Sequence, residues 1–183
     1  MKTIVRPVLL LLVAVCVAGA GPVPKKGEFS ATARVETYTG TRSMGFTLVV
    51  TNAMSMEDTA PLKEILAKGG QQALLNAIRG GGRGKISLGS FEYPVDLVVV
   101  EPQSDGVRYY VVTGRSLQYE EVNEGRDSMD HPFSVFVVNV PGFGTGDGRI
   151  YTKAALSIDE EGHVRAEQFG GQPGTLKDVK RLK

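Results

Sequence analysis

The chain has 183 residues, and its 21 lysines and arginines against 20 aspartates and glutamates give a formal net charge of +1. This balance argues against a nucleic-acid-binding protein and predicts no attraction to an anionic membrane surface. One cysteine and two histidines leave few residues for thiol nucleophiles, thiolate metal sites or iron–sulfur clusters.

The first 20 residues have the pattern of a secretory signal peptide. Lys2 and Arg6 precede an apolar run at residues 8–17, and residues 18–20, of sequence AGA, form a small-residue cleavage site. The run is shorter than the roughly 20 residues that a membrane-spanning helix needs. Cleavage would remove Cys16 and leave 19 basic against 20 acidic residues, a net charge of −1. We therefore expect an exported protein, periplasmic or extracellular, with no disulfide and no transmembrane segment in the mature chain.

Residues 21–27 form an expected exposed leader, and residues 28–183 an expected single domain. Apolar and polar side chains alternate at 29–37 and again at 44–50, which predicts two strands that each turn one face toward water. A turn around Gly40 would join these strands as a hairpin.

The segment 58–79 is the one long helical segment that the pattern predicts. Its apolar residues recur at spacings of three and four: Leu62, Ile65, Leu66, Leu74, Leu75 and Ile78. Gly69 and Gly70 interrupt the segment, and each costs about 1 kcal/mol relative to alanine in a helix interior. We therefore expect either one kinked helix or two short ones, around which the strands pack.

Residues 80–85, of sequence GGGRGK, follow this helix. A phosphate-binding loop of the P-loop kind precedes its helix, so that the helix N-terminus faces the anion. The order here is reversed, and we interpret the segment as a flexible helix terminus.

Further strands are predicted at 86–88, 93–101, 108–113, 133–140, 149–159 and 163–169. Those at 93–101 and 133–140 are apolar on both faces, which is typical of strands covered on both sides. A polar, basic tail at 170–183 ends the chain. We expect a mainly β fold of the α+β class, an antiparallel barrel or strongly curved sheet of roughly eight or nine strands, with the helix packed on it or plugging it.

An acidic segment at 120–130 is the densest group of potential oxygen ligands. It carries five acids, namely Glu120, Glu121, Glu124, Asp127 and Asp130. Such a loop can hold calcium, a hard cation that prefers oxygen ligands, although the spacing matches no calcium-binding loop and a solvated acidic surface has the same composition. Calcium binding is therefore an alternative function.

Asp130 and His131 are the candidates for catalysis. A hydrolase would need a nucleophile, a base and an orienting acid within hydrogen-bond reach. A catalytic zinc would need both histidines, His131 and His163, brought together with a carboxylate. Three tyrosines could line a ligand cavity: Tyr110, Tyr119 and Tyr151. Aromatic residues in strands ordinarily pack in the core, however.

Three segments resemble a family of uncharacterised exported bacterial proteins. They are Glu64 to Ala77 with its GGQQALL centre, Ser128 to Phe133, and Gly171 to Leu176. The family pattern has tyrosine where this chain has His131. The resemblance implies export and a single domain, and it carries no activity.

The leading hypothesis is a non-enzymatic envelope protein that binds a small apolar ligand or a partner protein. The doubly apolar strands and the shortage of catalytic groups motivate it, and a barrel mouth or a groove beside the helix is where a ligand would lie. The sequence predicts no cofactor and no nucleic-acid partner. The alternatives are calcium binding through residues 120–130 and a hydrolase that uses Asp130 and His131.

Overall fold

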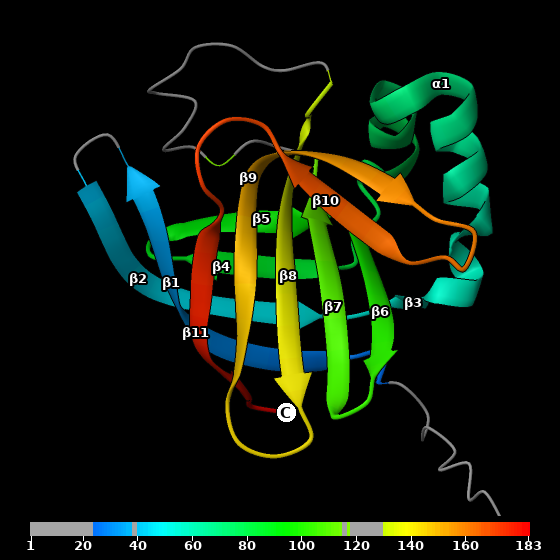
Figure 1. The fold of residues 1–183 in the computed structure, drawn as a ribbon. Coiled ribbons are helices and arrows are strands. Elements are labelled where there is room, and N and C mark those ends of the chain that lie inside the picture. The colour runs from blue at the N-terminus through cyan, green and yellow to red at the C-terminus, as the bar shows by residue number, and fades with distance from the viewer. Residues whose placement is uncertain (1–23, 38–39, 115–116, 118–129) are drawn as a thin grey trace, which may run out of the picture.

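A computed structural model describes residues 24–37, 40–114, 117 and 130–183 (Figure 1). The strands are β1 (Gly27–Thr37), β2 (Gly40–Val50), β3 (Met54–Ser55), β4 (Gly84–Leu88), β5 (Phe91–Val95), β6 (Leu97–Gln103), β7 (Gly106–Thr113), β8 (Phe133–Pro141), β9 (Gly146–Ile158), β10 (Val164–Gln168) and β11 (Gly174–Arg181). A short 3-10 helix, η1 (Met56–Thr59), leads directly into the helix α1 (Ala60–Ile78). The described residues therefore form a β-dominated fold with one α-helix, as predicted.

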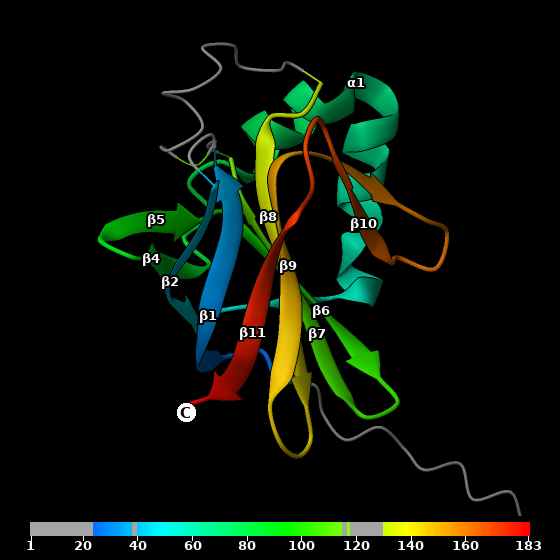
Figure 2. The ribbon, with the colours of Figure 1, turned by 60° about the vertical axis from the view of Figure 1, so that its left-hand side comes forward.

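The strands belong to a single sheet that curls into a half-barrel (Figures 1 and 2). Its order is β3-β6-β7-β8-β9-β11-β1-β2-β4-β5, and β10 pairs with β9 off this path. All pairings are antiparallel except that of β3 with β6. The predicted hairpin of β1 and β2 is confirmed, with Thr37 opposite Gly40.

The sheet curls so that its half with β6 to β9 faces its half with β1, β2, β4 and β5 (Figure 1). Side chains from the inner face of both halves fill the space between them. The largest of them form one buried cluster: Phe29, Phe46, Leu48, Ile86, Leu88, Tyr109, Leu117, Phe136, Ile150 and Leu176. Residues of α1 do not belong to this cluster. The helix therefore does not plug the sheet, and this alternative of the prediction is wrong.

Helix α1 packs instead on the outer face, together with β10 (Figure 1). Leu74, Leu75 and Ile78 are buried there against residues of β6 to β9. The predicted kink is present at Gly70, whose backbone angles of φ 65° and ψ −161° are strongly disfavoured for residues with a side chain. Directly after the kink, the Gln71 amide donates to the Leu156 carbonyl oxygen at 2.8 Å and accepts from the Leu156 N–H at 2.9 Å, which ties the helix to β9.

Strand β6 is buried on both faces, as the doubly apolar pattern predicts. Val98 and Val100 belong to the inner cluster, whereas Leu97 and Val99 pack toward α1. The single strand expected at 93–101 is nevertheless wrong, because Asp96 divides it into β5 and β6. The buried Asp96 carboxylate accepts hydrogen bonds from the backbone N–H groups of Gly80 and Gly114, each at 2.8 Å. Its side chain therefore holds the segments that follow α1 and β7.

The polar segment 170–183 contains β11, which lies between β9 and β1 in the middle of the sheet order. Leu176 and Val179 are buried, and the polar residues between them face outward. With this strand, the short β3 and the division at Asp96, eleven strands are present among the described residues, more than the eight or nine expected. No helix in the described ranges combines the length and apolarity needed to span a membrane.

Candidate functional site

The outer face of the sheet has a polar half beyond the area covered by α1 and β10. A hollow of about 490 Å³ lies there. We call it the outer groove and define it by its cationic and aromatic lining residues: Arg108, Tyr110, Arg149, Tyr151, Arg165 and Lys177. An adjoining hollow of about 540 Å³ shares Arg108, Asn139, Asp147 and Lys177 with it.

Strand register explains why these residues meet, although they are far apart in the sequence. Arg108 lies opposite Asn139, which lies opposite Asp147, and Arg149 lies between Val137 and Thr175 on its two neighbouring strands. Residues that are directly opposite in paired strands point to the same face of the sheet. Four strands, β7, β9, β10 and β11, each supply one cation to the outer groove.

Arg108 is held by a chain of hydrogen bonds along the floor of the groove. Its Nε donates to Asn139 Oδ1 at 2.8 Å, and Asn139 Nδ2 donates to Asp147 Oδ1 at 2.7 Å. The orientation of the guanidinium is therefore set in advance, which lowers the entropy cost of binding a ligand. Asp147 is the one acid among the residues described as lining this groove, and Asn139 already uses one of its oxygens.

Tyr110 is the most buried polar side chain in the groove, with 8% of its surface exposed. Burial raises the pKa of its hydroxyl above the usual value of 10.0. A hydrogen bond from Arg108 opposes this shift, whereas the negative charge of Glu101 and a hydrogen bond with its carboxylate add to it. The hydroxyl therefore stays neutral at physiological pH. The hydroxyl already contacts Arg108 and Glu101, so it could donate to an anion only in place of its hydrogen bond with Glu101.

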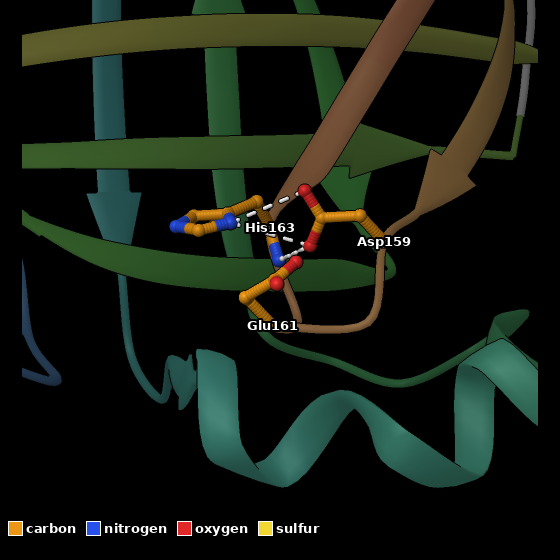
Figure 3. Close-up of side chains that lie close together, drawn as sticks. All are labelled: Asp159, Glu161 and His163. Atoms are coloured by element: carbon orange, nitrogen blue, oxygen red, sulfur yellow. Dashed lines mark hydrogen bonds and ion pairs between the residues drawn. The ribbon is translucent and has the colours of Figure 1, made fainter.

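A second polar group lies at the turn between β9 and β10 (Figure 3). The carboxylate of Asp159 points at the ring of His163, and both of its oxygens lie 3.2 Å from His163 Nδ1. Asp159 Oδ1 also accepts the backbone N–H of His163 at 2.8 Å. Glu161, between them in the turn, brings a third ligand atom, and the three atoms lie within 4.8 Å of one another.

Glu101, on β6, borders the same imidazole. Its Oε1 lies 4.0 Å from His163 Nε2 and accepts a hydrogen bond from Gln103 Nε2 at 3.0 Å. The residue is only 9% exposed, and its Oε2 has no hydrogen-bond partner among the described residues. We call Asp159, Glu161, His163 and Glu101 the His163 cluster.

The contacts between His163 and Asp159 make the free energy of unfolding depend on pH. Partial burial raises the pKa of Asp159, but the hydrogen bonds and positive charge of His163 outweigh this effect and lower the pKa below 3.8. A carboxyl with a lowered pKa stabilises the fold above its unfolded value, and this contribution disappears as the pH falls below 3.8.

We expect Asp159→Asn to be less stable than the unchanged protein at pH 6, and the difference to shrink toward pH 3. Urea unfolding at several pH values, with EDTA present, measures this. Glu160→Gln, which makes the same charge change in the same turn, is the control and should keep the unchanged protein's pH dependence. A stability difference for Asp159→Asn that is constant across this range would contradict the assignment.

The structure separates the two histidines that a catalytic zinc would have shared. His131 stacks on Phe169 with a ring-centroid distance of 4.8 Å. Phe169 directly follows β10 and His163 directly precedes it, so about six residues of extended chain, roughly 20 Å, lie between the two sites. His131 and His163 are therefore too far apart to meet the requirement that a shared catalytic zinc would set. Asp130 is exposed at the surface.

The other predicted site residues lie in two places. Tyr110 and Tyr151 both line the outer groove, whereas Tyr119 falls outside the described residues. The acids Glu120, Glu121, Glu124 and Asp127 also fall outside them, so calcium binding by segment 120–130 stays a prediction.

The His163 cluster and the four groove cations were not predicted. Asp159, Glu161 and His163 alternate in the sequence, and this spacing of carboxylates and an imidazole is a signal that could have identified the cluster. The groove cations carry no local signal, because each is a single charge on a different strand.

We compared the chain with protein-family models, with curated proteins and with solved structures, and none of them matches it.

Proposed function

We propose that this chain is a non-enzymatic, exported binding protein that holds a small organic anion in the outer groove. The convergence of Arg108, Arg149, Arg165 and Lys177 on a single hollow is the observation that carries the proposal. The volume of about 490 Å³ is in the range of sites for small ligands. A carboxylate or phosphate is the chemical group that these cations would recognise.

The chemistry of the lining supports an anion more than an apolar molecule. Arginine binds carboxylate and phosphate through two parallel hydrogen bonds, and such charge-assisted bonds are stronger than neutral ones. Arg165 also lies 3.6 Å from Asp159, so Arg108, Arg149 and Lys177 are the main candidates for direct contact. Tyr110 and Tyr151 add flat aromatic surface and hydroxyl groups, which suits a ligand with both a ring or carbon chain and an acid group.

A partner protein is the second candidate, and the surface around Phe143 favours it. Phe143 is 98% exposed in the loop between β8 and β9 and borders a hollow of about 750 Å³. Pro24, Val107 and Val140 also line this hollow, which is more apolar than the outer groove. Exposed aromatic residues of this kind are typical of protein interfaces.

The packed inner face limits where the expected small apolar ligand could bind. Because packed side chains fill that face, a small apolar ligand would lie in the hollow beside Phe143 and not inside the sheet. Export, calcium binding and the hydrolase that uses Asp130 and His131 stay predictions.

Binding of citrate and of inorganic phosphate to the mature protein tests the anion proposal. Isothermal titration calorimetry should give binding that weakens as salt is added, because screening reduces charge attraction. Arg149→Ala and Lys177→Ala should each weaken it roughly tenfold or more, since hydrogen bonds to charged groups contribute about 1.5–3 kcal/mol.

Lys180→Ala is the matched control, because Lys180 lies on the same strand as Lys177 but does not line the groove. It should bind like the unchanged protein, and so should Phe143→Ala. The proposal would be wrong if neither citrate nor phosphate bound, or if Lys177→Ala and Lys180→Ala lowered the binding affinity equally. A partner recovered by crosslinking and lost in Phe143→Ala would favour the second candidate.

A further inference from the structure

The His163 cluster combines nitrogen and oxygen ligands from two separate elements. Asp159, Glu161 and His163 come from the β9–β10 turn, and their ligand atoms lie within 4.8 Å of one another. Imidazole with carboxylates is a ligand set that suits zinc and similar transition metals, whereas calcium and magnesium prefer oxygen alone. Surface carboxylates gather in many proteins that bind no metal, so the turn by itself is insufficient.

Glu101 is the independent observation that points to a cation. It comes from β6, it is nine-tenths buried, and its Oε2 has no hydrogen-bond partner among the described residues. Burying a carboxylate with an unsatisfied oxygen costs free energy, so such an atom in a folded protein calls for an explanation. A bound cation would satisfy it.

The separation of His163 and Glu101 leaves room for a metal ion between them once the two side chains approach by about 0.6 Å. Zinc lies about 2.0–2.1 Å from histidine nitrogen and about 2.0–2.2 Å from carboxylate oxygen, so the two ligand atoms can be at most about 4.3 Å apart and are about 3.4 Å apart in a tetrahedral site. His163 Nε2 and Glu101 Oε1 are 4.0 Å apart. Asp159 meanwhile accepts from Nδ1 at 3.2 Å, which leaves the lone pair on Nε2 and matches the carboxylate–histidine–metal arrangement of many zinc sites.

The surroundings of the cluster are acidic. A hollow of about 290 Å³ between α1 and the β9–β10 turn is lined by five acids, namely Glu57, Glu64, Asp159, Glu160 and Glu161, and by one cation, Lys63. A concave surface lined mainly by one sign of charge concentrates ions of the opposite sign. Cations are therefore drawn to this end of the molecule.

We propose that the His163 cluster binds a divalent transition-metal ion of the zinc type, with His163 and Glu101 as ligands, Asp159 orienting the imidazole and Glu161 supplying a further oxygen. The site borders the outer groove, because Arg165 lies 3.6 Å from Asp159 and Glu101 lies opposite Arg108 on β7, but the proposal does not depend on anion binding. It places the cation against the buried Glu101 carboxylate, whose Oε2 has no hydrogen-bond partner among the described residues, and it gives the Asp159–His163 contact a role beyond closing the turn.

The test is titration of zinc chloride into the mature protein after EDTA treatment and its removal. Calorimetry should give one zinc ion bound per chain, and zinc should raise the melting temperature. His163→Ala and Glu101→Gln should each weaken zinc binding at least tenfold, and Glu161→Gln should weaken it to a smaller extent. Calcium chloride should cause no comparable rise in melting temperature.

Glu160→Gln is the matched control, because it removes an acid of the same turn that lies outside the cluster. It should bind zinc like the unchanged protein. Replacing zinc with cobalt(II) gives a second readout: visible absorption bands of a low-coordinate nitrogen and oxygen site that disappear in His163→Ala.

Glu161→Gln alters an exposed side chain, so it keeps the test open if His163→Ala or Glu101→Gln does not fold. No stoichiometric zinc binding, or the same affinity in Glu160→Gln and in all cluster variants, would overturn the proposal. A larger response to calcium than to zinc would overturn the assignment of the metal class.

Discussion

Phe136→Ala is expected to lower the free energy of unfolding by about 3–5 kcal/mol, the usual loss when a buried phenylalanine is truncated in a core. Phe136 lies on β8, is fully buried, and packs on Phe46 of β2 with a ring-centroid distance of 5.6 Å. Three strands, β9, β11 and β1, separate β8 from β2 in the sheet order. The two rings meet only because the sheet curls, so their contact stabilises the curled form of the sheet.

Urea unfolding of the mature protein measures this loss. Phe143→Ala is the control, because it makes the same chemical change at a side chain that is 98% exposed, and it should change stability little. Phe136→Leu should cost less than Phe136→Ala, since it leaves a smaller cavity. If Phe136→Ala cost less than about 1 kcal/mol, the inner face would be loosely packed, and an apolar ligand inside the sheet would return as a hypothesis.

Gly148→Ala is expected to have the second largest effect, at the upper end of the roughly 1–3 kcal/mol seen for overpacked sites. Gly148 lies in the middle of β9, opposite Val138 on β8 and Leu176 on β11. A methyl group there would overlap the Val137 carbonyl oxygen and would lie 3.0 Å from Leu176 Cδ1. The backbone oxygen cannot move without disturbing the pairing of β8 and β9.

This position lies where the sheet bends. The neighbouring pairing of β9 and β11 has an irregular register between Leu176 and Val179, and glycines and bulges are the usual devices by which sheets curve. Gly148 also lines the outer groove, so a distorted strand should weaken anion binding as well.

Thermal unfolding and citrate titration measure the two effects of Gly148→Ala. Gly45→Ala is the matched control, because Gly45 lies on β2 with open space where a methyl group would be placed. It should leave stability unchanged or raise it slightly, since glycine in a strand interior is itself unfavourable. Equal effects of the two substitutions would mean that close packing at Gly148 is not what shapes the sheet.

Much of the fold could be predicted because its signals are local. Alternation in β1 and β2 and the doubly apolar pattern of β6 follow directly from which faces are buried. The kink at Gly70 follows from the low helix propensity of glycine. Asp96 was missed because its role is to accept N–H groups from Gly80 and Gly114, which lie 16 and 18 residues away.

The candidate sites were predicted less well, and for a physical reason. Tyr110 and Tyr151 could be singled out as aromatic residues in strands, but Arg108, Arg149 and Lys177 look like ordinary surface charges until strand register places them together. Likewise Glu101 is one acid near the end of an apolar strand. Its burial and its position beside His163 become visible only when the fold places β6 next to the β9–β10 turn.

By itself, the amino-acid sequence determined the class of this protein: mainly β, with one interrupted helix and strands that need cover on both faces. These features depend on the period of apolar residues and on glycine propensity, which act within one element. The tertiary structure alone decided that α1 lies outside the curled sheet, that β11 occupies its middle, and that four cations and the His163 cluster meet on the outer face. Those outcomes depend on pairings between residues distant in sequence, whose energies no local pattern contains.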